Sequence, residues 1–423
     1  MVGKGEVNET KKIFLNLLNY CIASFILLNA NTVYIHSNPK VYQICQMIFP
    51  IICLFFIFIS FCFNDFKIDY MFFFGIGVSL YILMWVLYQI AFLGGNRTSL
   101  LIPINFCLIF LLIWTQIKKN NLIQLTNAYV NLVVIVAAIS IVFWLLTNIF
   151  HKLIPSNYVL LYWGYERFIP NYHNLYFETQ QWGDIFRNTA IFTEAPMAAL
   201  NFLVALAFNM IFLNKTKLAK FKSFILIIAG LMTISTTMYI GILALLIYRF
   251  FEKTARANKY ISLIKFIFII ILFVISAVIV NSLINSKLQT GSGIDRSSDY
   301  INGINAWINH PIMGNGLNAG INEGTTIING EVIGHYGFSS SFSQLLGDSG
   351  LFLVIPIFLS ILETIRKSIF IKEWKILILS ILFMYLVFVS IFTTTYLFMY
   401  LLIFIVMWNF SDISELNRKA HLE

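Results

Sequence analysis

The hydrophobic residues of this chain of 423 residues fall in long runs that are separated by short polar segments. Runs of about 16 to 25 apolar residues recur along the whole sequence, and runs of this length are typical of helices that span a membrane. The pattern predicts about twelve spanning helices. We expect them near residues 13–30, 41–63, 70–94, 99–117, 128–150, 189–213, 221–235, 237–251, 260–284, 341–364, 374–392 and 394–410.

Two of the apolar stretches are too long for a single helix each. The stretch 221–251 is interrupted by polar residues near Ser235, and the stretch 374–410 is interrupted near Thr394. At 1.5 Å per residue, a helix of about 31 residues would measure about 46 Å, whereas the core of a bilayer is about 30 Å thick. We therefore predict two short helices in each stretch.

The composition agrees with this pattern. Hydrophobic residues make up 59% of the chain, charged residues only 11%, and the mean hydropathy is +0.82. A soluble domain of similar size carries about 25% charged residues. The chain is therefore predicted to be an all-α polytopic membrane protein, with residues 1–423 forming a single integral membrane domain.

The distribution of basic residues predicts the orientation in the membrane. If both termini are cytoplasmic, most of the 28 lysines and arginines fall in cytoplasmic segments, as the positive-inside rule requires. The net charge of +9 is then explained by topology and does not indicate nucleic-acid binding. The same orientation places two long polar loops, 151–188 and 285–340, on the extracytoplasmic side.

Cysteine and histidine residues give no sign of a metal centre. The five cysteines lie in or beside apolar runs, and their odd number and positions predict free thiols rather than a disulfide framework. The six histidines show no ligand spacing, so neither a metal nor another cofactor is predicted.

Three arginines on the predicted extracytoplasmic side are candidate substrate-binding residues. Arg187 precedes an apolar helix, Arg296 lies in the second long loop, and Arg97 lies in a turn between two helices. A guanidinium group is planar and permanently charged, so it suits a phosphate or pyrophosphate. These arginines can instead reach lipid headgroups or pair with a nearby acid, which would be Asp184 or Glu194 for Arg187 and Asp295 or Asp299 for Arg296.

Glu194 and His335 are candidates for a general base. Glu194 lies near the start of a predicted helix, where a carboxylate also interacts favourably with the positive helix end. His335 lies in the second long loop and titrates near neutral pH, although a single loop histidine is often an ordinary polar residue. Both interpretations stay open for each residue.

The composition of the two long loops points to carbohydrate. The first loop is rich in Tyr, Trp and Asn, and the second in Gly, Asn and Ser. Aromatic rings stack on sugar faces and amides pair with hydroxyl groups. The alternative for the first loop is an aromatic belt at the membrane surface.

The segment HPIMGNGLNAG in the second loop contains Gly314, Gly316 and Gly320. This spacing is superficially similar to a dinucleotide-binding pattern, but no strand–helix unit encloses it. We therefore predict that these glycines allow a tight loop.

Three segments, in order, resemble the superfamily of O-antigen ligases and Wzy-type O-antigen polymerases. They are RNTAIFTEAPMAALNF, then STTMYIGILALLIY, then DRSSDYINGINAWINHPIMGNGLNAG followed by SSSFSQLLGDSGLFLVIPIF. They resemble the family's arginine-containing helix start, its Ser/Thr-rich turn, and its loop arginine with an HP-x-x-G-x-G element. The resemblance covers residues 187–357.

This resemblance implies a GT-C-like membrane glycosyltransferase of the bacterial inner (plasma) membrane. Its donor would be an oligosaccharide on undecaprenyl pyrophosphate, within membrane lipid and without a cofactor. Arg187 and Arg296 would bind the pyrophosphate. A protein that regulates chain length is a partner that the analogy implies.

One departure from the family favours a polymerase. Family ligases carry a histidine at the position that Ser339 occupies here, and the nearest histidine, His335, lies four residues earlier. We therefore expect a polymerase of oligosaccharide repeat units. The alternatives are a ligase that transfers the glycan to lipid A-core, and a flippase for the lipid-linked oligosaccharide, which would not be an enzyme.

Overall fold

The computed structural model of the chain describes residues 4–62, 66–119, 121–163, 165–213, 216–254, 291–317, 325–328, 331–334, 338 and 340–408. Of the described residues, 74% are helical. The described helices are α1 (Lys4–Leu28), α2 (Val33–Ser37), α3 (Pro39–Cys62), α4 (Tyr70–Phe92), α5 (Leu101–Lys118), α6 (Ile123–Trp144), α7 (Ala195–Phe208), α8 (Lys217–Leu231), α9 (Thr236–Thr254), α11 (Gly291–Asn309), α12 (Ser341–Phe370), α13 (Trp374–Val389) and α14 (Tyr396–Trp408).

Three short helical segments extend or connect these helices. A 3-10 turn, η1, precedes α5, and π-helical turns follow α6 and α7; they are η1 (Arg97–Leu100), η2 (Leu145–Ile149) and η3 (Asn209–Leu213).

Within the described residues, six helical segments are long and apolar enough to cross a membrane. They are Pro39–Cys62, Tyr70–Phe92, Arg97–Lys118, Ile123–Ile149, Ala195–Leu213 and Ser341–Phe370. Four shorter apolar helices accompany them, at Ile13–Leu28, Thr236–Arg249, Trp374–Val389 and Tyr396–Trp408. The predicted helical character is therefore confirmed, and the six segments are compatible with a multi-pass membrane protein, whereas the total of about twelve spans and the GT-C likeness stay predictions. The helix predicted at 260–284 lies outside the described residues.

Both predicted interruptions of long apolar stretches are present. Helix α8 ends at Leu231 and α9 begins at Thr236, with Ile234 in a left-handed backbone conformation between them (φ 49°). Helix α13 ends at Val389 and α14 begins at Tyr396. Polar residues in these turns satisfy backbone groups that a continuous helix would have paired internally.

The predicted start of the helix at 189 is wrong, because α7 begins only at Ala195. The residues before it form turns and a single bridge, between Phe192 and Thr32, in the segment after α1. The N–H of Val33 donates to the carbonyl of Ile191 (2.9 Å), and the N–H of Thr193 donates to the carbonyl of Asn31 (3.0 Å). This pairing with a distant segment competes with helix formation, and the sequence pattern does not reveal it.

The first long loop is not irregular but folds into small antiparallel sheets, which the prediction of an all-helical chain missed. One sheet has the order β1-β2-β3, made by β1 (Asn157–Trp163), β2 (Tyr165–Tyr172) and β3 (Tyr176–Phe177). A second pairs β4 (Gln181–Trp182) with β5 (Ile185–Phe186), and in the second loop β6 (Thr325–Ile328) pairs with β7 (Glu331–Gly334). The second loop also contains helix α11.

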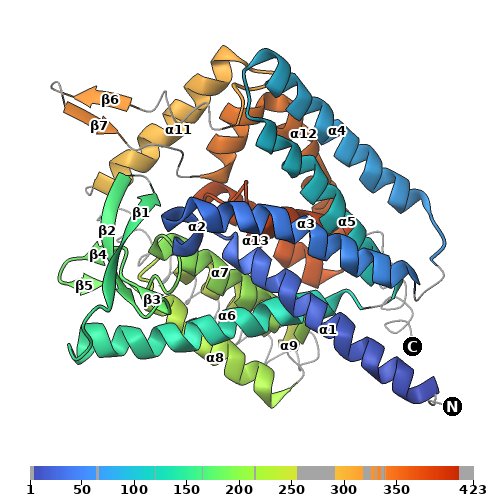
Figure 1. Cartoon of the computed structure of the whole chain (residues 1–423), viewed down its shortest axis with the longest axis horizontal. Coiled ribbons are helices and arrows are strands. Elements are labelled where there is room, and N and C mark those ends of the chain that lie inside the picture. The colour runs from blue at the N-terminus through green and yellow to red at the C-terminus, as the bar shows by residue number, and fades with distance from the viewer. Residues whose placement is uncertain are drawn as a thin grey trace.

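The three-stranded sheet packs on α2. Leu161, Ile169 and Phe177 form a small buried cluster with Val33. The sheets lie at the end of the molecule that is opposite to the start of α1 (Figure 1). This arrangement fits the predicted separation of the first long loop from the N-terminus, while the membrane sides themselves stay a prediction.

Two helices at the centre are buried on almost every side. All residues of α7 are buried, and in α14 all except Val406 are buried. They contact each other through aromatic rings, since Phe208 lies 5.3 Å from Phe404 between ring centroids. These helices form the core around which the other helices pack.

Candidate functional site

Arg187 is buried, with 9% of its surface exposed, and its guanidinium group joins two parts of the chain. Nε donates to the carbonyl of Thr233 (2.8 Å) and Nη2 to the carbonyl of Ile234 (3.0 Å), both just after α8. Nη1 donates to Oε1 of Gln180 (2.9 Å). A cation near the end of a helix is favoured by the helix dipole, so Arg187 stabilises the α8–α9 turn.

Gln180 connects Arg187 with the start of α7. Its Oε1 also accepts a hydrogen bond from the N–H of Ala195 (3.2 Å), the first residue of that helix. Glu194 is the residue before it, at the N-cap position, but its side chain makes no capping hydrogen bond. The structure therefore brings Arg187 and Glu194 into one cluster through Gln180.

The carboxylate of Glu194 contacts the first sheet instead. Its Oε1 accepts a hydrogen bond from Nε1 of Trp163 (2.8 Å), at the end of β1. The ring of His36, from α2, lies edge-on to the indole at 4.7 Å between centroids. Burial lowers the pKa of His36 to about 4, so this imidazole is neutral at neutral pH. We call Arg187, Gln180, Glu194, Trp163 and His36 the arginine cluster.

The other sequence candidates do not join this cluster through any described contact. Arg97 lies in η1, between α4 and α5, and its side chain is exposed. Arg296 belongs to α11, one helical turn before Tyr300, but its side chain is not among the described ones. His335 lies outside the described residues, so its predicted role is neither supported nor contradicted.

An apolar cavity of about 590 Å³ lies between α4, α5, α12 and α14. Aromatic and aliphatic side chains line most of it. Polar side chains gather where α12 begins, namely Gln344, Asp348 and Ser349, and at the α13–α14 turn, namely Thr393 and Thr394. The cavity thus has a long apolar body and one polar end.

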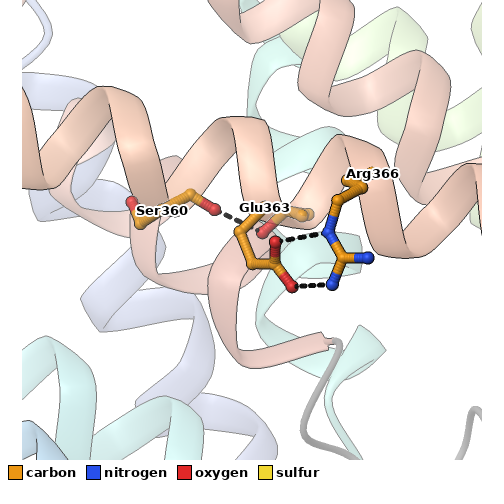
Figure 2. Close-up of polar contacts among 4 residues, drawn as sticks. Ser360, Glu363 and Arg366 are labelled. Carbon is orange, nitrogen blue, oxygen red and sulfur yellow. Dashed lines mark hydrogen bonds and ion pairs between the residues drawn. The ribbon is translucent and has the colours of Figure 1, made fainter.

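The cavity extends along α12 toward its C-terminal part. Ser360 lines it and lies 16 residues after Gln344, which corresponds to about 24 Å of helix. Figure 2 shows Ser360 together with the next turn of α12, where Glu363 accepts two hydrogen bonds from Arg366, at 2.7 and 2.6 Å. This exposed ion pair marks the end of the helix opposite to the polar end of the cavity.

The polar end of the cavity lies where α12 is kinked. Gly350 has a left-handed φ of 57° that interrupts the helix. The segment 310–316 satisfies the freed backbone groups. The N–H groups of Leu351 and Phe352 donate to the carbonyls of Pro311 and Ile312 (both 2.9 Å).

Hydrogen bonds also run in the opposite direction between these segments. The N–H of Asn315 donates to the carbonyl of Gly347, and that of Gly316 to the carbonyl of Asp348 (both 3.0 Å). We call this backbone pairing the glycine seam. Gly314 and Gly316 have φ of 73° and 98°, as the predicted tight loop requires, while Gly320 lies outside the described residues.

Helix α4 reinforces the glycine seam with three side chains. Trp85 Nε1 donates to the carbonyl of Met313 (3.1 Å), and Tyr81 donates to that of Phe352 (2.7 Å). Gln89 donates to the carbonyl of Asp348 (3.4 Å). Asp348 therefore lies, 3% exposed, in a part of α12 that is held from two sides.

A chain of hydrogen bonds links the arginine cluster with the polar end of the cavity. The N–H of Thr193, next to Glu194, donates to the carbonyl of Asn31, and Nδ2 of Asn31 donates to the carbonyl of Ile391 (both 3.0 Å). Two residues later, Thr393 hydrogen bonds to Gln344 at the rim of the cavity. The two polar regions are thus linked through buried hydrogen bonds and two short stretches of backbone.

Sequence reasoning missed several residues of this region. Asp348 is an acid between apolar turns of a membrane helix, and such an acid is a recognisable signal. Gln180, Gln344 and His36 carry no comparable signal, because isolated amides and imidazoles are common in polar loops.

Comparisons with known proteins add no assignment to this geometry. No protein-family model matches the chain, and no curated protein matches it.

Proposed function

We propose that this protein is a membrane glycosyltransferase that polymerises oligosaccharide repeat units carried on undecaprenyl pyrophosphate. The observation that carries the proposal is the form of the cavity between α4, α5, α12 and α14. Its apolar body suits a polyprenyl chain, and the amide, carboxyl and hydroxyl groups at its polar end suit the hydroxyl groups of the first sugars. The resemblance of residues 187–357 to O-antigen polymerases supports the same class.

The reaction needs a cation near the leaving group. The acceptor hydroxyl attacks the anomeric carbon of the donor glycan, a new C–O bond forms, and the bond to the pyrophosphate breaks with its electron pair leaving on the pyrophosphate. The acceptor proton passes to a base. Arg187 and Arg296 are the proposed stabilising cations, because negative charge grows on the leaving pyrophosphate in the transition state.

We propose that the carboxylate of Glu194 is the general base. Glu194 is half-buried, is oriented by Trp163, and belongs to the same cluster as Arg187. His335 stays the alternative from the sequence. The exposed Tyr158, Tyr162 and Phe168 of the first sheet offer ring surfaces for sugars.

A flippase is less well supported by the distribution of polar side chains in the described cavity. A path across the membrane would need polar side chains along its length. In the described cavity the polar groups gather mainly at one end, and the opposite end contributes Ser360. A ligase shares the donor chemistry, so only the products separate it from a polymerase.

Deleting the gene and analysing both the surface glycan and the lipid-linked pool tests the proposal. If the protein is a polymerase, the deletion strain should carry surface molecules with a single repeat and should show no ladder of longer chains. Long chains that accumulate on the lipid carrier would instead identify a ligase. Single repeats trapped on the cytoplasmic face would identify a flippase, and either result would overturn the proposal.

Substitution of the two arginines tests their proposed role. We expect Arg187→Ala and Arg296→Ala each to abolish long chains, because loss of one charge-stabilising donor slows such reactions by about 10²- to 10³-fold. Arg366→Ala is the matched control, since it removes an exposed arginine that pairs only with Glu363 in the contacts of Figure 2. Ladders of normal length from arginine variants that are inserted normally would reject the role.

A further inference from the structure

A second, smaller pocket lies at the other end of the helix bundle and has no part in the proposed reaction. It encloses about 290 Å³ between the start of α6, the turn η3 and the start of α8. Helix α6 and η2 lead directly to β1, so the start of α6 lies away from the sheets. Its polar lining consists of Gln124, Asn127, Asn209, Thr216 and Lys222.

Two helices begin at this pocket. Helix α6 begins at Ile123 and α8 begins at Lys217, where Thr216 caps the helix by accepting from the N–H of Ala219 (3.1 Å). Helix N-termini carry partial positive charge and attract anions. The starts of both helices therefore contribute to a positive potential in the pocket. No carboxylate among the lining residues offsets this potential.

Lys222 adds a full positive charge. Its Nζ donates to Oδ1 of Asn131 (2.5 Å), which belongs to α6. The ion pairs found among the described residues join Lys118 with Asp69 and Arg366 with Glu363, and none involves Lys222. The half-buried ammonium group thus has a neutral partner and no described counterion.

Asn209 supplies an acceptor that the fold does not use. The residue is fully buried and lines the pocket, at the first position of the π-helical turn η3. Its Nδ2 donates to the carbonyl of Ala219 (2.6 Å) and to Ser223 (2.8 Å). Because a carbonyl can only accept, the orientation of this amide is fixed, and its Oδ1 accepts no hydrogen bond from the described residues.

The surroundings of the pocket indicate a lipid rather than a soluble ligand. Leu218 and Phe221, on α8 beside Lys222, expose 61% and 59% of their surface. Large exposed apolar side chains next to lysines suit the surface of a bilayer, where the apolar groups meet acyl chains and the lysines meet headgroups. A ligand at Lys222 can therefore keep its headgroup in the pocket and its tails against α8.

We propose that this pocket binds an anionic phospholipid whose headgroup carries hydroxyl groups, of the phosphatidylglycerol type. The phosphate would pair with Lys222 and the helix N-termini, and a headgroup hydroxyl would donate to Oδ1 of Asn209. An ammonium headgroup would place a second cation beside Lys222. This proposal does not depend on the proposed glycosyltransferase activity.

Native mass spectrometry of the delipidated full-length protein, titrated with phosphatidylglycerol, phosphatidylethanolamine or phosphatidylcholine, tests the proposal. We expect Lys222→Gln to bind phosphatidylglycerol about tenfold more weakly, the loss of one charge-assisted contact. The amide of glutamine can still donate to Asn131, and the melting temperature without lipid checks that the variant folds. Lys220→Gln is the matched control, because Lys220 is exposed on the same helix and does not line the pocket.

The result separates a specific site from general attraction. Equal losses in both lysine variants, or equal affinity of the wild type for the three lipids, would overturn the proposal. A soluble competitor, sn-glycerol 3-phosphate, distinguishes the source of the phosphate. If sn-glycerol 3-phosphate displaces phosphatidylglycerol when the two are present at equal concentrations, the ligand is a soluble polyol phosphate and the lipid assignment is wrong.

Discussion

At the scale of single residues, Arg187 shows how one side chain can organise a membrane protein surface. The sequence predicts its importance from a charge at the boundary of an apolar helix. The sequence does not predict its partners, because two of them are the backbone carbonyls of Thr233 and Ile234, and every residue has a carbonyl. The alternative of a pairing with a nearby acid named Glu194, whereas the structure links Arg187 to the start of α7 through Gln180.

His36 leads to a prediction about pH. Burial lowers its pKa from 6.5 in the unfolded chain to about 4 in the folded protein. Between these values the unfolded state binds a proton that the folded state does not bind, so the free energy of unfolding falls as the pH decreases from 6.5 to 4. His36→Phe removes this group while keeping a ring against Trp163.

The measurement compares melting temperatures of the purified protein at pH 7.5 and 4.5. We expect the wild type to lose more stability on acidification than His36→Phe does. An equal loss in both proteins would show that other groups cause the acid sensitivity.

At the scale of elements, the glycine seam explains why α12 can be kinked without loss of backbone hydrogen bonds. The sequence predicts a tight loop from Gly314 and Gly316, but it does not predict that this loop pairs with the residues on both sides of Gly350, 34 residues after Gly316. Likewise, pairing of the segment before α7 with the segment after α1 shortens α7 at its start. Contacts between distant segments leave little trace in hydrophobic periodicity, which is a local signal.

Substitutions at the glycine seam should therefore be severe. A Cβ atom at Gly314 would lie 2.3 Å from the carbonyl oxygen of Asp348, and φ there is +73°. We expect Gly314→Ala to destabilise the protein by about 2 kcal/mol or more, from steric conflict and backbone strain together. Thermal unfolding in detergent measures this loss.

Gly77→Ala is the control for the glycine substitution. A Cβ atom at Gly77, in α4, would meet no atom within 4 Å. Because alanine favours helices over glycine by about 1 kcal/mol, this variant should be as stable as the wild type or more stable. Similar melting temperatures for Gly314→Ala and the wild type would contradict the importance of the seam.

At the scale of the whole molecule, the described helices agree with the predicted membrane character, and they confirm both short helix pairs that hydrophobic patterning predicts. The patterning does not predict the cavity, because a cavity depends on how α4, α5, α12 and α14 diverge, and apolar residues that line a cavity look like those that fill a core. The strands of the first loop were also missed, since their aromatic residues fit a membrane-surface belt equally well.

Filling the cavity tests its proposed role as the site of the polyprenyl chain. Leu353, on α12, lines the cavity, and Leu353→Trp should obstruct it. We expect long-chain glycan to decrease about tenfold, equivalent to about 1.4 kcal/mol of lost binding, while the protein still inserts. The glycan ladder on a gel and the protein level in the membrane are the measurements.

Leu359→Trp is the matched control on the same helix. Leu359 exposes 59% of its surface and does not line the cavity. We expect its ladder to match that of the wild type. If both tryptophan variants shorten the ladder equally, the effect does not come from the cavity.

The central position of α7 and α14 has a consequence for biosynthesis. Helix α7 lies near the middle of the chain, but α14, against which Phe208 packs, is made much later. A nascent chain that already contains α7 therefore has to shelter its small-residue surface, from Ala195 to Ala207, with lipid or with an insertion chaperone until α14 arrives. Completion of the core thus waits for the synthesis of α14, and a ribosome that stops before Tyr396 would leave behind a protein that membrane proteases can recognise as unfinished.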